Sequence, residues 1–295
     1  MSPTGDLDSH LSLEQQLREA CLWEVFSPKP GNVHPAAAFR DMTWRDFVRS
    51  AHAAAPPLAR ARESGVGAAV RAAIQATRAV TAVNTNLGLV LLLAPLAAVP
   101  AHLSLEQGLE PVLARLDLAD SHAVYQAIAL TQPGGLGRVD RGDVTTGPTG
   151  TLREMMALAA GHDAIAAEYA QGFPRVLQVG VPSLRRWQAH GPATAVVATQ
   201  LELLTRCPDS LIARKCGAPL ADEASQRASE VLAAGWPHTP TGQVALAEFD
   251  HWLRADGHRR NPGTTADLVG ASLFAFFRDD QPGWPPCPLA ELSDA

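Results

Sequence analysis

The sequence predicts an all-α protein that forms a single compact multi-helix domain. Alanine, leucine and arginine dominate long stretches, aromatic residues make up only 5% of the 295 residues, and β-branched runs are few. Residues of these types favour helices, and the apolar side chains recur at helical rather than alternating spacing. With 46% apolar residues the chain can bury a full-sized core, which excludes the disordered and fibrous classes of protein.

The first helix is expected to begin after Ser12, because Ser12 and Gln15 have the spacing of a capping box. Apolar residues then recur at helical spacing until Pro28 and Pro30 end the helix. Glu24 lies on this apolar stripe, where a carboxylate must be paired, bound to a metal or protonated. An ion pair with a buried arginine is the structural alternative.

Each further helix is predicted from a run of helical periodicity bounded by turn residues. The predicted spans are residues 43–54, 66–82, 85–99, 121–130, 151–173, 193–205, 222–234, 241–256 and 264–277. In the span 151–173, Asp163 is the only charge on an apolar face, which indicates a carboxylate facing an inward site. Glu154 instead fits a capping box with Thr151. The strand-like run at 175–180 is isolated.

One domain is expected over residues 12–280, between an N-terminal tail at 1–11 and a C-terminal tail at 281–295. No internal repeat or low-complexity linker divides this span. The Gly- and Pro-rich stretch 132–150 is interpreted as a long loop within the domain, and a domain boundary near residue 140 is the alternative.

Charge and cysteine content exclude several kinds of partner. The chain carries 24 Lys and Arg against 30 Asp and Glu, a net charge of −6, and has no basic run, so nucleic acid is not expected to bind. The apolar run 87–100 is too short to span a bilayer, and residues 1–10 lack the features of a targeting peptide. We therefore expect a cytoplasmic protein without a membrane partner, its four cysteines free, and leave a homo-oligomer open.

Three short turns rich in Gly, Pro, Asn or Thr lie where predicted helices end or begin, at 28–32, 84–88 and 261–267. In the last, Thr264 is expected to cap a helix whose first turn holds Asp267, which leaves free backbone N–H groups at the positive end of the helix dipole. Such an end suits phosphate, and Asp267 would then bind a Mg²⁺ that bridges carboxylate and phosphate. The structural alternative is an ordinary capped helix.

The only two lysines of the chain, Lys29 and Lys215, add cations to these segments. Lys29, held between two prolines, is interpreted as a phosphate contact or as a solvated turn residue. Arg214 and Lys215 are adjacent before a turn and could bind phosphates together. Among the histidines only His34, close to Lys29, is a candidate ligand.

The three turns together resemble the triphosphoribosyl-dephospho-CoA synthase family. The matching motifs are Ser-Pro-Lys-Pro-Gly-Asn-Val at 27–33 followed by Asp41 and Met42, Asn-Thr-Asn-Leu-Gly at 84–88, and Asn-Pro-Gly-Thr-Thr-Ala-Asp-Leu at 261–268. Their order and separations match too, and the resemblance covers residues 17–277. It implies an all-α transferase that moves the triphosphoribosyl group of ATP to a hydroxyl of dephospho-CoA, releases adenine, and uses Mg²⁺.

The resemblance also implies roles for individual residues. Substrate binding is assigned to Lys29, Gly31, Asn32, His34, Asn84, Thr85, Asn86, Arg214, Lys215, Asn261, Gly263, Thr264 and Thr265. Mg²⁺ is assigned to Asp267 together with Glu24 or Asp163. Proton transfer is assigned to Asp41 or to another of these carboxylates, Glu24 or Asp163.

The chain departs from the better-known members of the family at several motif positions. It has Asn-Val-His at 32–34 where they read Leu-Val-Asp, and Asn86 and Leu87 where they have His and Lys. These losses favour a divergent branch, so other functions stay open: the same ATP chemistry on another acceptor in methanofuran or tetrahydromethanopterin biosynthesis, a metal-dependent phosphohydrolase using His162 and Asp163, or a non-catalytic nucleotide-binding protein.

Overall fold

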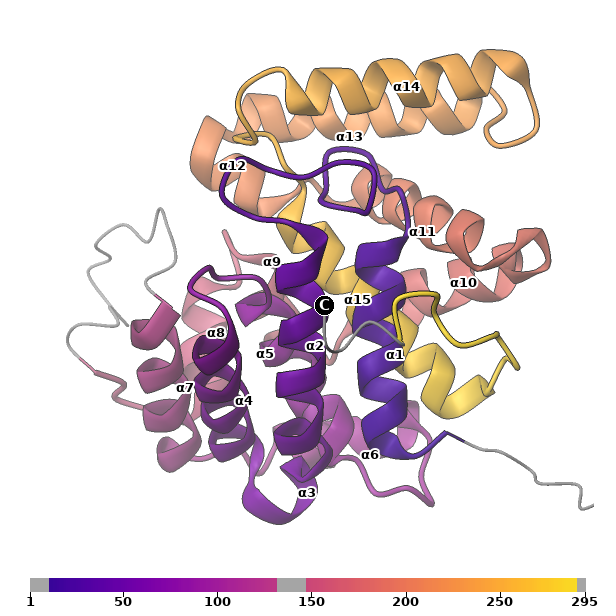
Figure 1. Cartoon of the computed structure of the whole chain (residues 1–295). Helices are drawn as coiled ribbons and strands as arrows, with labels where there is room; N and C mark the ends of the chain where they lie inside the picture. The colour runs from indigo at the N-terminus through magenta and orange to yellow at the C-terminus, as the bar shows by residue number, and fades with distance from the viewer. Residues whose placement is uncertain (1–10, 132–146, 291–295) are drawn as a thin grey trace, which may run out of the picture.

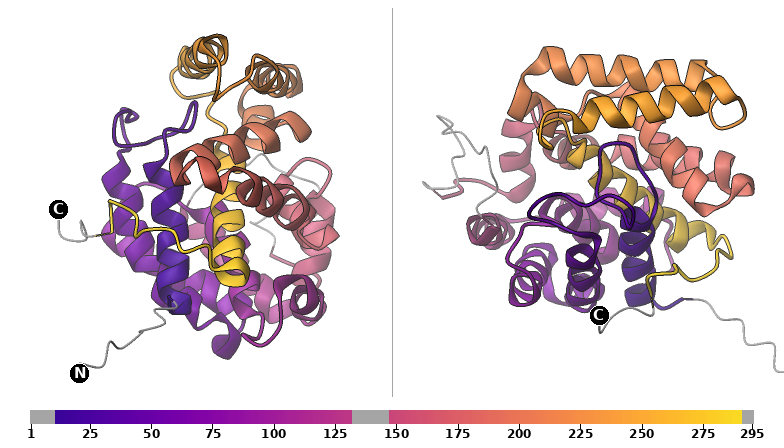
Figure 2. Two further views of the ribbon diagram at one scale, coloured as in Figure 1. Left: turned by 90° about the vertical axis from the view of Figure 1, so that its right-hand side faces the viewer. Right: turned by 45° about the horizontal axis from the view of Figure 1, so that its top comes forward.

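Helices run through most of the chain that the structure describes, which is residues 11–131 and 147–290 of a computed structural model. Figures 1 and 2 show two packed layers, with upright helices below and a flatter layer above. No β-strand occurs in these residues, where an isolated bridge pairs His34 with Ala37. The predicted all-α, single-domain fold is confirmed. Within the same ranges, no helix is both long and apolar enough to cross a membrane.

The lower layer contains the first nine helices together with the last one. These are α1 (Leu13–Phe26), α2 (Trp44–Ala59), α3 (Ala61–Ser64), α4 (Val66–Val80), α5 (Leu87–Ala98), α6 (Leu105–Leu113), α7 (Leu118–Thr131), α8 (Leu152–Ala159), α9 (Ala164–Gln171) and α15 (Gly263–Asp280). The remaining helical elements of the described chain are a π-helical turn (Val176–Gly180), α10 (Val181–Trp187), a 3₁₀ turn (Gln188–His190), α11 (Pro192–Arg206), α12 (Ser210–Cys216), α13 (Ala218–Ala233) and α14 (Pro240–Arg254).

Helices α5 and α15 form the centre of the lower layer. Every residue of α5 from Leu89 to Ala98 is buried, as expected for a helix that is apolar on all sides. Helix α15 packs against α5, α1 and α11, and is buried along most of its length. A second apolar cluster joins α11 to α12, α13 and α14, and Figure 1 shows α13 and α14 side by side across the top of the molecule.

The turn at 28–32 connects the two layers. The Gly31 N–H donates to Oδ1 of Asp250 on α14 at 2.7 Å, and Nη2 of Arg254 donates to the carbonyl oxygen of Asn32 at 2.7 Å. From α11, Nε2 of Gln200 donates to Oδ1 of Asn32 at 2.7 Å. Polar groups of the upper layer therefore fix the backbone of this turn.

Several predicted elements are confirmed by their caps. Ser12 and Gln15 form the capping box of α1, and Thr151 and Glu154 form that of α8. Helix α6, which periodicity did not predict, also begins with a capping box, of Ser104 and Gln107. A search for this spacing alone would have located it.

Other predicted elements need correction. The single helix predicted over 151–173 is wrong, because the chain breaks after α8 and Asp163 starts α9. Helix α2 continues past residue 54 through Pro56 and Pro57 to Ala59. Burial of Leu58 compensates for the hydrogen bonds that the prolines cannot donate. The strand-like run at 175–180 forms the π-helical turn instead.

The segment 281–290 packs against α1 and α15, although the sequence analysis assigns it to a C-terminal tail. The indole of Trp284 meets the rings of Trp23 and Phe276 edge-on, with centroids 5.7 and 5.6 Å apart. The N–H of Cys287 donates to Oε2 of Glu19 at 2.7 Å. This segment carries no helical periodicity, so its burial is decided by contacts with distant residues.

Candidate functional site

A cavity of about 1390 Å³ brings the motif segments together. Its walls come from α1, α2, α5, α7, α8, α9, α12 and α15 and from the loops that precede α2, α5 and α15. The predicted site residues that line it are Glu24, Asn32, Asp41, Asn84, Thr85, Asn86, Asp163, Arg214, Lys215, Asn261, Gly263, Thr264 and Asp267. Turns that lie far apart in the sequence thus share one site.

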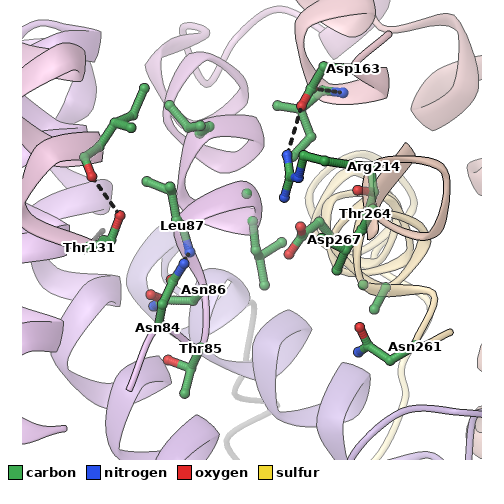
Figure 3. Close-up of a pocket in the computed structure, with 18 of the residues that line it drawn as sticks. Asn84, Thr85, Asn86, Leu87, Thr131, Asp163, Arg214, Asn261, Thr264 and Asp267 are labelled. Atoms are coloured by element: carbon green, nitrogen blue, oxygen red, sulfur yellow. Dashed lines mark hydrogen bonds and ion pairs between the residues drawn. The ribbon is translucent and has the colours of Figure 1, made fainter. Parts of the chain in front are cut away.

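The amino ends of α5, α9 and α15 meet at this cavity. Leu87 and Gly88 begin α5, Asp163 precedes α9, and Gly263 and Thr264 begin α15, and all five residues line the wall. Figure 3 shows Leu87 between Thr131 on one side and Asp163, Thr264 and Asp267 on the other. Each of these ends already lies beside a carboxylate: Asp163 accepts from α9, Asp209 from α15 and Asp267 from Leu89 of α5.

Asp163 has two roles in this arrangement. Its Oδ1 accepts hydrogen bonds from the N–H groups of Ile165 at 2.9 Å and Ala166 at 3.0 Å, so it caps α9. Its Oδ2 lies 3.9 Å from Nη1 of Arg214 on α12, the ion pair drawn in Figure 3. The lone acid predicted on one face of a continuous helix is therefore a helix cap that also faces the cavity.

The start of α15 differs from the prediction because a carboxylate from another element already occupies it. The helix begins at Gly263 after Pro262, and Thr264 lies inside the first turn rather than at the cap. Both the N–H and the hydroxyl of Thr265 donate to Oδ2 of Asp209, at 2.7 and 2.8 Å. The predicted contact of Thr265 with substrate is not supported by the cavity lining, because Thr265 is buried away from it.

Asp209 was missed from the sequence, although it organises two helices. Its Oδ1 accepts from the N–H groups of Leu211 and Ile212 and caps α12, while its Oδ2 holds Thr265. An aspartate before a helix is a common cap, and that local pattern could have predicted its first role. Its second role depends on the packing of α12 against α15.

Asp267 lines the cavity one turn into α15, beside Gly88 at the start of α5. A Cβ at Gly88 would overlap with its Oδ2, so only glycine allows this approach. Burial raises the pKa of Asp267 well above its usual range, and the nearby carboxylates of Glu24 and Asp209 raise it further. A cation bound beside this carboxyl would relieve that cost.

Lys29 and Glu24 form a buried ion pair, and the cavity lining does not support the predicted contact of Lys29 with phosphate. The Lys29 side chain is 0% exposed, and its Nζ lies 2.8 Å from Oε1 of Glu24 and donates to the Glu24 carbonyl oxygen. Lys29 does not line the cavity, whereas Glu24 does. The lysine therefore compensates the Glu24 charge and ties it to the end of α1.

Two further residues of the first motif also lie away from the cavity. Gly31 is buried against Leu253 and Pro262 and has a positive φ of 75°, so its role is to form the turn. His34 is half-buried, and burial and the nearby charge of Arg254 lower its pKa. The predicted contacts of Gly31 and His34 with substrate are not supported by the cavity lining.

The middle motif forms the turn that starts α5. Oδ1 of Asn84 accepts from the Leu87 N–H at 3.3 Å, and the Thr85 hydroxyl lies 2.6 Å from that of Ser50. Nδ2 of Asn86 donates to the Thr77 hydroxyl at 3.1 Å. These bonds fix the amino end of α5 toward the cavity.

Helix α12 supplies two cations of the site, and the loop before α15 adds Arg259. Arg214 and Lys215 lie in the last turn of α12, both exposed and both lining the cavity. Partial burial and the neighbouring Arg214 charge lower the pKa of Lys215. The charge of Asp41, on the loop before α2, partly offsets this by raising the pKa of Lys215. Asp41 therefore faces the same region.

An aromatic pair that the sequence analysis did not single out closes part of the wall. The rings of Phe39 and His258 stack with centroids 3.9 Å apart and join the loop before α2 to the loop before α15. His258 has a positive φ of 70°, which is rare for a residue other than glycine. Such a pair offers a face on which a purine ring can stack.

No three His, Cys, Asp or Glu side chains of the described residues come close enough together to hold a metal ion unaided. The predicted set of Asp267, Glu24 and Asp163 therefore does not form a complete metal site. His162 lines the cavity beside Asp163, but the pair lacks further ligands in the same part of the chain.

Comparisons with known proteins identify what this chain is similar to. A profile of the ATP:dephospho-CoA triphosphoribosyl transferase family, CitG, matches residues 10–285. The chain is 36% identical over 121 residues to a protein assigned as a 2-(5''-triphosphoribosyl)-3'-dephosphocoenzyme-A synthase in Pseudomonas fluorescens, which covers 40% of this chain and 41% of the relative. The synthase of that name in Klebsiella pneumoniae is 33% identical over 112 residues, covering 37% and 39%.

These alignments span about two fifths of the length of the curated relatives in Pseudomonas and Klebsiella. A longer one, to a protein assigned the same name in Lactiplantibacillus plantarum, covers 93% of this chain and 99% of the relative at 27% identity. The crystal structure of a protein assigned as a triphosphoribosyl-dephospho-CoA synthase from Archaeoglobus fulgidus is similar at TM-score 0.62 and 26% identity, and covers 80% of this chain and 99% of that chain.

Proposed function

This chain belongs to the ATP:dephospho-CoA triphosphoribosyl transferase family, and on that premise we propose that it transfers the triphosphoribosyl group of ATP to a hydroxyl of dephospho-CoA and releases adenine. The membership confirms the resemblance stated from the three motifs. The observation that carries the proposal is the cavity in which the cations Arg214, Lys215 and Arg259 lie together with the carboxylates of Glu24, Asp41, Asp163 and Asp267. Its 1390 Å³ exceed what one small ligand usually fills, as a reaction of two nucleotides requires.

The reaction exchanges one bond at the ribose. The bond between C1′ of the ribose and N9 of adenine breaks, and adenine leaves with the electron pair and takes up a proton. A bond forms between C1′ and the acceptor oxygen, which loses its proton, while the triphosphate stays on the 5′ carbon. The site must hold the triphosphate, stabilise positive charge at C1′ and accept the acceptor proton.

We assign the triphosphate to the end of the cavity that holds Arg214 and Lys215. These cations lower the energy of bound phosphate. Mg²⁺ commonly uses one or two carboxylates together with phosphate and water, so Asp267 and Asp163 would hold it beside the phosphates. When bound it would neutralise phosphate charge; Glu24 is already paired with Lys29.

We assign the proton transfer to Asp41. Its carboxylate lines the cavity and has no hydrogen bond or ion pair with the described residues, whereas Asp163 caps a helix and Glu24 is buried with Lys29. A base must be free to approach the acceptor hydroxyl. Asp41 is the carboxylate of the predicted set that meets this need.

The test is mass-spectrometric detection of adenine from purified protein with ATP and Mg²⁺, with and without dephospho-CoA. We expect adenine only with dephospho-CoA, together with a product heavier by one triphosphoribosyl group. Formycin triphosphate, whose base is joined to the ribose by a carbon–carbon bond, should bind and yield no base. Absence of adenine despite nucleotide binding would overturn the proposal. Asp41→Asn should lower kcat by about 10² to 10⁴-fold.

A further inference from the structure

Among the described residues that line the cavity, the charged side chains gather on one part of the wall. Glu24 lies on α1, Arg214 and Lys215 on α12, and Asp267 on α15. Asp41, Asp163 and Arg259 lie on adjoining loops. In Figure 3 Asp163, Arg214 and Asp267 lie together on one side, and Thr131 lies on the opposite side. A ligand that fills the whole cavity must therefore have a charged part and an uncharged part.

The opposite wall, which we call the α7–α8 wall, contributes no charged side chain among the described lining residues. Its members are Val124, Tyr125, Ile128, Ala129, Thr131, Leu152, Met155, Met156 and Ala159. The Thr131 hydroxyl already donates to the carbonyl oxygen of Ile128 at 2.8 Å. Burying an anion against this wall would leave its charge uncompensated, whereas an uncharged chain would gain from contact with it.

We propose that the α7–α8 wall binds the uncharged pantetheine arm of the acceptor, while the phosphates of both substrates occupy the charged end. The inference rests on the proposed function and adds the position of the acceptor. ATP has no long uncharged arm, and dephospho-CoA has one that extends away from its two phosphates. The cavity is continuous between the two ends, so one acceptor molecule can occupy both.

The adenine ring of a substrate is the other uncharged group that could occupy this wall. A purine needs hydrogen-bond partners along its edges and a flat aromatic face. Among the described lining residues the α7–α8 wall has one aromatic ring, of Tyr125, whereas Phe39 and His258 stack together at the charged end, beside Asp41 and Lys215. The pantetheine arm is a flexible, uncharged chain with two amide groups, a hydroxyl and a terminal thiol, and Met155 and Met156 suit it because their thioether side chains adapt to irregular shapes.

The position of the pantetheine arm is tested by measuring ligand affinities in the absence of turnover. Isothermal titration calorimetry compares dephospho-CoA with ADP, which has the same adenosine diphosphate part without the arm, in protein saturated with formycin triphosphate. We expect dephospho-CoA to bind at least tenfold tighter than ADP. Met156→Glu should abolish this difference and leave the Kd of ADP unchanged. The control Leu158→Glu lies on the same helix but is 52% exposed and outside the cavity lining, so it should preserve the difference.

Ile128→Gln provides a second variant if Met156→Glu does not fold, with the exposed Leu130→Gln as its control. Equal affinities of ADP and dephospho-CoA for the unmodified protein would overturn the inference. A weakening of formycin triphosphate binding in Met156→Glu, with the acceptor unaffected, would instead assign the wall to adenine. Because neither result requires adenine release, failure of the proposed reaction and failure of this inference are distinguishable.

Discussion

At the scale of single residues, the Lys29–Glu24 pair shows how burial changes the meaning of a motif. A lysine between two prolines is equally compatible with a solvent-facing phosphate contact and with a structural role. In the structure the Lys29 ammonium is fully buried and pairs with the Glu24 carboxylate, near the carboxyl end of α1. The charge that resembled a ligand for ATP therefore orients a carboxylate of the cavity wall.

Lys29→Met should lower the free energy of unfolding by about 3–5 kcal/mol, because it leaves Glu24 buried without its partner. Urea denaturation measures this loss. The double variant Lys29→Met with Glu24→Gln should recover much of it, since no charge is then left unpaired. An unchanged stability combined with a higher KM for ATP would show that Lys29 binds phosphate after all.

Lys215 should make nucleotide binding sensitive to alkaline pH. Partial burial and the Arg214 charge lower its pKa, although Asp209, Cys216 and Asp41 oppose the shift. A lowered pKa means that its positive charge is lost earlier as pH rises, so the affinity for formycin triphosphate should fall at a lower pH than for an ordinary lysine. Lys215→Arg should retain affinity to higher pH. Identical pH profiles of the two proteins, measured by calorimetry, would refute this role.

At the scale of elements, helix starts determine where the polar groups of the site lie. Asp163 caps α9 with one oxygen and faces Arg214 with the other, and Asp209 joins the starts of α12 and α15. Each of these two aspartates caps a helix in addition to its contact with another element. The site uses side chains that the helices require in any case.

Substitutions at Asp163 should separate its cap from its charge. Asp163→Asn keeps an oxygen for the α9 cap, so stability should change little, whereas loss of the charge should weaken Mg²⁺-dependent nucleotide binding. Asp163→Ala also loses the cap and should cost about 1 kcal/mol of stability. Thermal unfolding and calorimetry on the two variants check this. Equal stability of both variants would contradict the cap as the main structural role.

At the scale of the whole molecule, the cavity couples the two layers. Helices α5 and α9 of the lower layer and α12 of the upper layer all contribute to its wall. The turn at 28–32 joins the same layers through Asp250, Arg254 and Gln200. A ligand in the cavity therefore contacts both apolar clusters of the molecule.

Formycin triphosphate at 100 times its Kd should raise the free energy of unfolding by about 2.7 kcal/mol. Because both layers contact it, hydrogen exchange should slow at the starts of α5, α9 and α15 and also in α12. Adenosine, which lacks phosphates, is the matched control and should protect α12 less. Protection confined to the lower layer would show that the ligand does not bridge the two layers.

Much of the fold could be predicted because its determinants are local. Capping boxes at Ser12 and Thr151 define helix starts through bonds three residues apart, and apolar periodicity defines the helices between them. The break at Asp163 and the docking of Trp284 were missed. Neither can be inferred from periodicity alone, since one depends on a cap inside an apolar run and the other on contacts with distant helices.

The sequence by itself determined the all-α fold, the membership of the family and the segments from which the site is built, because helix propensity, caps and motifs are properties of neighbouring residues. Only the tertiary structure decided which of those residues face the cavity. In that structure Lys29 is buried against Glu24, and Asp209 accepts the hydrogen bonds at the start of α15. The charged wall and the α7–α8 wall lie on opposite sides of the cavity. Exposure and pairing of a polar group depend on what packs around it, and those neighbours come from distant parts of the chain.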